Sequence, residues 1–183
     1  MSFKEKVKRW IKKKLGIVEP HVNTIEDYRK LGVTIGEGTK IYQANINAGH
    51  GFLVTIGKNC ILSSCTILSH DGSTYMALGY SRVGKVVIGD EVFVGIGSVI
   101  LPNVTIGSRV IIGAGAVVTH DIPDNSIAVG NPARVIGTYD DYIEKNRKLL
   151  ETNPRYETYH AYKSDEEKAD MVAKIDGIIG FDK

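Results

Sequence analysis

Aliphatic residues recur at a period of six between Ile88 and Pro123, a stretch that divides without remainder into six hexads. Each hexad opens with a bulky aliphatic residue, and these openers are Ile88, Val94, Ile100, Ile106, Ile112 and Val118. Four positions after them stand Val92, Ser98, Val104, Val110, Ala116 and Ile122. A period of six matches neither an amphipathic helix, whose apolar face recurs near 3.6 residues, nor an alternating strand of period two.

We interpret each hexad as one short strand followed by a turn. Three such rungs would form one coil of a parallel β-solenoid, in which each opener stacks on the opener of the neighbouring coil and fills a narrow core. A glycine follows most openers, and we expect it to adopt the tight, often left-handed backbone that a corner requires. The pattern therefore predicts an all-β solenoid.

Earlier hexads extend this solenoid toward the N-terminus, from Val33 onward. They open at Ile35, Ile41, Ile56, Leu62 and Leu68. Two segments, 47–54 and 70–87, break the period, and insertions in a solenoid are extruded at a corner as loops. The second segment is polar and aromatic, so we look for function there. The predicted solenoid domain spans residues 33–137.

The segment before the solenoid, residues 1–32, is basic and helix-like. Residues 3–15 place Phe, Val, Trp and Ile near one face, with lysines around the rest. This pattern fits either a short helix packed on the body with a solvated basic face or an interfacial helix on anionic lipid. Thr24 is predicted to cap a brief helix that ends at Arg29 or Lys30.

The segment after the solenoid, residues 138–183, is charged and predicts further helices. Ser164 with Glu167 three residues later is a capping-box pattern for the last helix. An uncapped coil would expose strand edges, so we expect these helices to cover the open C-terminal end of the solenoid.

Composition narrows the possible partners. The net charge of +2 over 183 residues does not indicate nucleic acid. Two cysteines five residues apart, Cys60 and Cys65, favour neither a zinc site nor a disulfide framework, and Cys60 is predicted to be a small inward filler. No apolar run of about 18 residues and no signal-peptide core occur, so a cytoplasmic protein is expected, with peripheral membrane contact if the basic helix meets lipid.

The hexads, the phrase IGAGAVVTHDIPDNSIAVGNPARVI and the loop that begins at His70 resemble the hexapeptide-repeat acyltransferases over residues 33–137. Within that family the sequence looks like the O-acetyltransferases of sugars and surface polysaccharides, including galactoside acetyltransferases. The resemblance implies a left-handed parallel β-helix with flanking α-helices. It also implies a homotrimer that binds acetyl-CoA in grooves between subunits, with no metal.

By this resemblance, His70 is the catalytic histidine. Acetyl transfer from a thioester to an alcohol needs a base for the hydroxyl proton, and a neutral imidazole suits that role. The alternative is a loop histidine bonded to a carbonyl group. Asp71 is adjacent, but neighbours on an extended backbone point to opposite sides, so no orienting role is predicted for it.

The resemblance also assigns an acetyl-CoA site along the later rungs. Its predicted residues are Ile96, Ala114, Thr119, His120 and Arg134. The first two would act through their backbone, whereas the Arg134 guanidinium could fork onto phosphate oxygens or serve in a surface ion pair. Relatives commonly carry lysine at the His120 position and a second basic residue at Gly137, so this chain departs from the pattern on the phosphate side.

The acceptor side is predicted less fully. Asn45 lies in a YxAN phrase similar to a sugar-contacting strand of galactoside acetyltransferases, and His50 in the first insertion could line the same site. Tyr80 and Arg82 could contact a saccharide from the second insertion, or the aromatic residues of that loop could pack between subunits.

The leading hypothesis is acetyl-CoA-dependent O-acetylation of a sugar or polysaccharide unit, with backbone N–H groups stabilising the oxyanion. N-acetylation of an amino sugar is the alternative within enzymes. A zinc enzyme resembling the γ-carbonic anhydrases would need three histidine ligands, and His50, His70 and His120 lie in separate segments. A structural trimer that does not bind acetyl-CoA is the remaining alternative.

Overall fold

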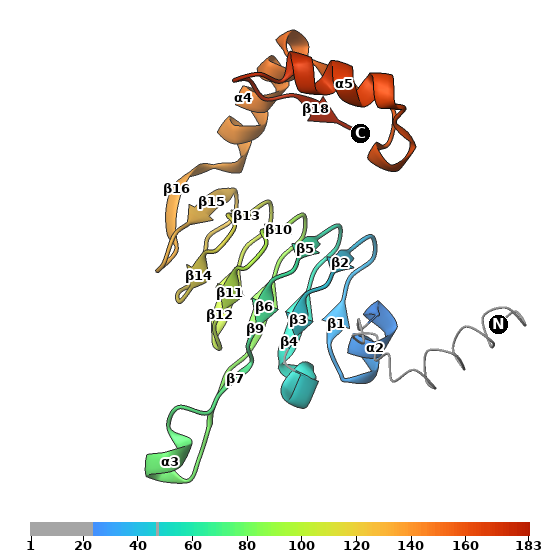
Figure 1. Ribbon diagram of the computed structural model, residues 1–183. Coiled ribbons are helices and arrows are strands. Elements are labelled where there is room, and N and C mark those ends of the chain that lie inside the picture. The colour runs from blue at the N-terminus through green and yellow to red at the C-terminus, as the bar shows by residue number, and fades with distance from the viewer. Residues whose placement is uncertain (1–23, 47) are drawn as a thin grey trace, which may run out of the picture.

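The computed structural model describes residues 24–46 and 48–183. The predicted basic helix at residues 3–15, with its membrane contact, lies outside the described residues. Among the described residues, no helix is both long enough and apolar enough to cross a bilayer. Figure 1 shows a regular solenoid with one extruded hairpin and a separate C-terminal unit.

Three sheets form the sides of the solenoid, and the chain visits them in the same order in every coil. Sheet A contains β1 (Thr34–Ile35), β4 (Val54–Ile56), β9 (Val86–Ile88) and β12 (Val104–Ile106). Sheet B contains β2 (Lys40–Tyr42), β5 (Ile61–Ser63), β10 (Phe93–Val94), β13 (Ile111–Ile112), β15 (Ser126–Val129) and β16 (Arg134–Thr138). Sheet C contains β3 (Asn45–Ile46), β6 (Thr66–Ile67), β11 (Val99–Ile100) and β14 (Val117–Val118). The predicted parallel solenoid is confirmed.

The predicted openers stack through parallel pairing and fill the core. In sheet A, for example, Ile56 pairs with Ile88, which pairs with Ile106. All six openers between Ile88 and Val118 are buried, as are the six residues four positions after them. Alternation along each strand explains this, because inward residues face the core and their neighbours face outward.

The prediction that Leu68 opens a hexad and faces the core is wrong. In the first two coils, the rung that leads to sheet C is one residue shorter than in the later coils. Ile67, not Leu68, pairs with Ile100 and is fully buried. Ser64 adopts a φ of 41° at this corner, whereas the later coils use six-residue rungs with Gly97 at 72°. The shorter corner therefore keeps the core aligned although the period slips.

The glycines that follow openers serve a different purpose from the one predicted. In the six-residue rungs, positive φ angles fall three residues after an opener, as at Asn59 and Glu91, rather than at the following glycine. The glycine after Ile56 is needed because a Cβ on Gly57 would lie 2.4 Å from the carbonyl oxygen of Gly89. Close backbone stacking between coils, rather than left-handed geometry, therefore requires glycine there.

Both predicted insertions leave the solenoid at the corner between sheets C and A. The first contains η1 (Ala48–Leu53), and the second contains β7 (His70–Asp71), α3 (Tyr75–Leu78) and β8 (Arg82–Val83). Figure 1 shows this second insertion projecting from the solenoid with α3 at its tip. Val54 and Val86, placed in the insertions by the hexad pattern, are buried residues of sheet A, so each loop ends earlier than predicted.

The short helix α2 (Ile25–Lys30) confirms the predicted cap. Thr24 accepts a hydrogen bond from the Asp27 N–H, and the Asp27 carboxylate accepts one from the Thr24 N–H in return. Tyr28 of this helix is buried, and its hydroxyl donates to the Ala44 carbonyl at 2.6 Å. The helix is thereby fixed to the first coil.

The C-terminal unit contains α4 (Tyr139–Thr152), β17 (Arg155–Tyr156), η2 (His160–Tyr162), α5 (Asp165–Lys174) and β18 (Phe181–Asp182). Ser164 and Glu167 form the predicted capping box. The expected covering of the solenoid end is wrong: α4 has no buried residue, and both helices lie to one side of the solenoid (Figure 1). The last coil instead pairs β15 with antiparallel β16.

Candidate active site

A cavity of about 480 Å³ opens where the second insertion leaves the corner between sheets C and A. It is lined by Leu68, His70, Asp71, Gly72, Arg82, Leu101, Pro102 and Thr119. Three predicted site residues, His70, Arg82 and Thr119, are therefore brought together although they are far apart in the sequence. The cavity combines a titratable base, an ion pair and an apolar wall, as ligand sites commonly do.

The wall of this cavity is built by stacked corners. The Leu68 N–H donates to the Ile100 carbonyl at 2.9 Å, and the Leu101 N–H donates to the Val118 carbonyl at 3.0 Å. These bonds align Leu68, Leu101 and Thr119, which each follow the inward residue of a sheet C strand. Neighbouring coils thus contribute equivalent positions to one surface.

His70 is half-buried at the base of the extruded hairpin, where β7 pairs antiparallel with β8. Asp71 follows it and accepts hydrogen bonds from the Ser73 N–H at 2.8 Å and the Ser73 hydroxyl at 3.0 Å. Arg82 lies across the hairpin with its guanidinium 4.0 Å from the Asp71 carboxylate. The bonds from Ser73, with a smaller contribution from Arg82, lower the pKa of Asp71. Asp71 is therefore engaged within the hairpin, by Ser73 and by Arg82.

His50 approaches the same site from the previous coil. Its ring stacks on that of His70, with centroids 5.5 Å apart and planes inclined by 23°. The residue before His70, Ser69, donates its hydroxyl to the His50 carbonyl at 3.2 Å. The two histidines predicted for the site are therefore direct neighbours.

The predicted acetyl-CoA residues border the outer face of sheet C. Ile96 and Ala114 are exposed at the corner between sheets B and C, where the Gly115 N–H donates to the Ile96 carbonyl at 2.9 Å. Thr119 lies at the opposite edge, in the cavity wall. Arg134 is exposed directly after Ala133, whose N–H donates to the Val117 carbonyl at 2.8 Å.

The remaining predicted residues lie outside the cavity lining. Asn45 is exposed on the outer face of sheet C and pairs with Thr66. Tyr80 is exposed at the far part of the hairpin. His120 is exposed with its Nδ1 2.7 Å from the Thr119 hydroxyl oxygen. The Arg134 guanidinium donates to the Ala133 carbonyl at 2.9 Å, and the surface ion pair considered for it does not form with any described residue.

Sequence reasoning missed the apolar part of the lining, formed by Leu68, Leu101 and Pro102. A signal existed, because each leucine follows the inward residue of a sheet C strand, at the position that Thr119 occupies in the last coil. This signal can be recognised only when the pairing of the coils is known, because that pairing makes Ile67 the inward residue of its strand.

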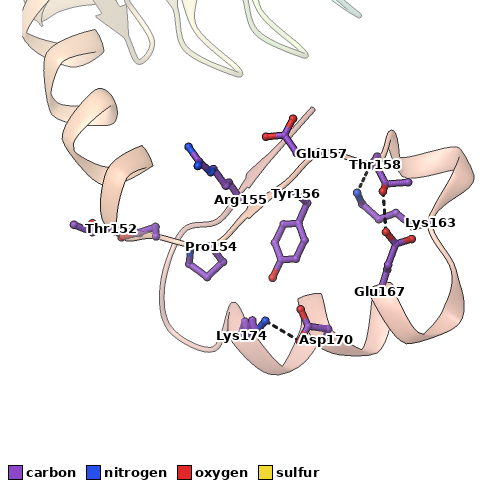
Figure 2. A pocket seen from close by; sticks show the side chains of 11 residues that line it. Thr152, Pro154, Arg155, Tyr156, Glu157, Thr158, Lys163, Glu167, Asp170 and Lys174 are labelled. Carbon is purple, nitrogen blue, oxygen red and sulfur yellow. Dashed lines mark hydrogen bonds and ion pairs between the residues drawn. The ribbon is translucent and has the colours of Figure 1, made fainter.

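A second cavity, of about 630 Å³, lies within the C-terminal unit (Figure 2). Several of its charged side chains have partners within the unit: Lys174 contacts Asp170 at 2.9 Å, and Glu167 accepts a hydrogen bond from the Thr158 hydroxyl at 2.8 Å. Lys163, which also lines it, forms an ion pair with Asp182 at 2.7 Å. These internal pairs stabilise the unit itself.

Across residues 24–46 and 48–183, no three histidine, cysteine, aspartate or glutamate side chains gather as a metal site would require.

Residues 85–120 match the family described as bacterial transferase hexapeptide (six repeats). Protein CapG of Staphylococcus aureus is 40% identical over 131 residues, which cover 67% of this chain and 76% of CapG. The chain belongs to the hexapeptide-repeat transferase family. This membership confirms the predicted fold class, a left-handed parallel β-helix.

Two solved structures extend the comparison. The acetyltransferase VCA0836 of Vibrio cholerae, solved with acetyl-CoA, aligns with a TM-score of 0.54 and 26% identity over 59% of this chain and 61% of that one. The polySia-specific acetyltransferase NeuO aligns with a TM-score of 0.50 and 28% identity over 58% of this chain and 52% of that one. Other curated relatives are covered less fully, for example 55% of YvoF from Bacillus subtilis.

Proposed function

We propose that this protein is an acetyl-CoA-dependent O-acetyltransferase that acts on a hydroxyl group of a sugar or polysaccharide unit. The observation that carries the proposal is the position of His70. This half-buried imidazole lines a cavity with Arg82 and Thr119, at the edge of the sheet C face that bears the predicted acetyl-CoA residues. The proposed base and the proposed binding face for acetyl-CoA would thus lie on either side of one cavity.

The donor side is supported by one of the solved relatives. VCA0836 was solved with acetyl-CoA, and its fold aligns with this solenoid. In this chain Ile96 and Ala114 are exposed at one edge of sheet C. The Ile96 carbonyl already accepts from the Gly115 N–H, so an extended amide-bearing arm would bind to other backbone groups of these two residues. Arg134 would contact the phosphates, because a guanidinium binds phosphate oxygens in a bidentate way.

The proposed reaction uses His70 as a general base. As the acceptor oxygen attacks the thioester carbonyl carbon and forms the new C–O bond, the imidazole takes the hydroxyl proton. The tetrahedral intermediate then expels the CoA sulfur by cleavage of the C–S bond. The imidazolium returns its proton to that sulfur, so the products are the acetyl ester and free CoA thiol.

A saccharide acceptor is supported by NeuO, which is named as specific for polysialic acid. The polar side of the cavity, with Arg82 and Asp71 in an ion pair, offers charged hydrogen-bonding groups suited to hydroxyls. We further propose a homotrimer, as the family resemblance implies, in which Asn45 and Tyr80 would meet the acceptor at a subunit boundary.

The test is acceptor-dependent release of free thiol from acetyl-CoA, measured with a panel of sugars and amino sugars. His70→Ala should lower the rate by about 10² to 10⁴-fold, because a positioned general base typically contributes that much. His160→Ala is the matched control, since His160 lies in η2 of the C-terminal unit.

Three results would count against parts of the proposal. Activity unchanged in His70→Ala would remove His70 as the base. Activity with amino sugars alone would replace O-acetylation with N-acetylation. If no thiol is released and calorimetry detects no binding of acetyl-CoA, the non-catalytic structural trimer is the alternative that would replace the proposal.

A further inference from the structure

We propose that His50 is a positioning residue for His70: its ring forms the surface against which the imidazole of the base is held. This inference rests on the proposed function for its catalytic consequence, but its structural part can be measured without activity. The observation behind it is the ring stack across two coils, with centroids 5.5 Å apart and planes inclined by 23°. Stacked aromatic pairs favour this range of separations.

The backbone of His50 is fixed on both sides. Ser69, which is fully buried, donates its hydroxyl to the His50 carbonyl at 3.2 Å. The next residue, Gly51, packs so closely that a Cβ would lie 2.3 Å from the Leu31 carbonyl oxygen. His50 itself has a non-helical backbone, with φ of −134° and ψ of 38°, inside η1. The first insertion is therefore anchored at His50, on one side to Ser69 and on the other, through Gly51, to Leu31.

The ring of His50 is also held from the side. Phe52 contacts it with ring centroids 6.0 Å apart and planes inclined by 51°. The Nδ1 atom of His50 is buried and has no hydrogen-bond partner among the described residues. Because packing rather than a bond at Nδ1 holds this ring, we infer that it acts through its face.

The residue that this stack would position is His70. His70 begins the extruded hairpin, which is attached to the solenoid only at its base. A general base acts efficiently only when its nitrogen stays in line with the proton it removes, and misplacement by about 1 Å can cost roughly 10²-fold in rate. Stacking on the anchored ring of His50 would restrict the orientation of the His70 ring. The stack should therefore contribute to kcat and little to donor binding.

Three substitutions separate aromatic stacking from simple filling of space. His50→Ala removes the platform, His50→Phe keeps an aromatic face, and His50→Leu keeps bulk without one. We expect His50→Ala and His50→Leu to lower kcat by about 10- to 100-fold while the KM for acetyl-CoA changes less than about threefold. We expect His50→Phe to recover kcat to within about threefold of wild type.

A spectroscopic readout tests the stack directly. In protein with carbon-13-labelled histidine, the His70 ring signal is assigned by its loss in His70→Ala. A neighbouring ring shifts that signal, so His50→Ala and His50→Leu should move it while His50→Phe leaves it dispersed. Far-UV circular dichroism confirms that each variant is folded.

The results distinguish the positioning role of His50 from the proposed acetyltransferase function. Wild-type kcat in His50→Ala, equal rescue by Leu and Phe, or a His70 signal indifferent to residue 50 would overturn the positioning role. If the wild type transfers no acetyl group but the His70 signal still depends on the ring at residue 50, the proposed function fails and the contact stands. If His70→Ala is inactive and His50→Ala is fully active, the proposed function stands and the positioning role fails.

Discussion

Gly57 and Gly89 face each other in adjacent coils so closely that a Cβ on Gly57 would lie 2.4 Å from the Gly89 carbonyl oxygen. The Gly57 N–H donates to the carbonyl of Ile88, the residue before Gly89, at 2.8 Å. Gly36 and Gly107 continue the same column at the corner after sheet A. The distance between coils at this corner is thus set by direct contact between their backbones, and no space is left for a side chain.

We predict that Gly57→Ala destabilises the protein by about 1 to 3 kcal/mol, because overpacking forces the backbone to shift. Gly137→Ala is the matched control, since a Cβ there meets no atom within 4 Å. Urea denaturation of the two variants would show the difference. If the two variants unfold at the same urea concentration, close contact between these glycines does not set the distance between coils.

The two cysteines should not react in the native protein. Both are buried, and burial raises the pKa of Cys65 to about 11 and raises that of Cys60 as well. Since only the thiolate attacks, an aromatic disulfide reagent at pH 8 should modify neither residue until the protein is unfolded. Both thiols should then titrate in guanidinium chloride. A native thiol that reacts at pH 8 would contradict this burial, and it would also add background to the acetyl-CoA assay.

The repeat made most of the fold predictable, because a period of six places one residue per rung in the core wherever the rung length is constant. It failed at Leu68, where a five-residue rung ends at Ile67. That shortening depends on the backbone at Ser64, which has a φ of 41° and no clear signature in the sequence. Pairing between coils, not the local period, decides which residue faces inward.

The site was predictable only in part, for a related reason. His70 could be found from its family pattern, but its contact with His50 requires knowing that one coil separates the two insertions. The capping box at Ser164 fixed where α5 begins, yet such local signals do not specify what a helix packs against. Helices expected over the solenoid end therefore lie elsewhere.

The ion pair between Lys163 and Asp182 should make the C-terminal unit sensitive to acid. The Lys163 side chain is only 4% exposed, and its amine lies 2.7 Å from the Asp182 carboxylate. The hydrogen bond from Lys163 lowers the pKa of Asp182 below its usual range. A lowered carboxyl pKa contributes stability that is present above about pH 4 and is lost as the pH falls through the folded value.

We therefore expect Lys163→Met to lower the melting temperature at pH 7 and to differ less from wild type below about pH 4. Near-UV circular dichroism of the tyrosines in this unit would follow its melting. Lys168→Met is the control, because its partner Asp165 is exposed and surface pairs contribute little. A difference that is constant between pH 3 and pH 7 would show that the charge pair is not the cause.

Arg134 offers the sharpest test of the donor side. Its exposed guanidinium lies next to the last coil of sheet C and currently bonds only the neighbouring Ala133 carbonyl among the contacts of the described chain. If it binds a CoA phosphate, Arg134→Gln removes a charge-assisted bond of about 1.5 to 3 kcal/mol. The KM for acetyl-CoA should then rise by roughly 10- to 100-fold, with kcat within about twofold, because the contact is uniform between ground and transition states.

Arg147→Gln is the matched control for this experiment, since Arg147 lies on α4 and pairs with Glu144 on the surface. The affinity for CoA, measured by calorimetry, should fall in Arg134→Gln and show a weaker dependence on salt, because one phosphate contact is lost. An unchanged KM in Arg134→Gln would place the phosphates elsewhere. Since His120 is exposed beside Thr119, a double variant with His120→Ala would then show whether that imidazole binds them instead.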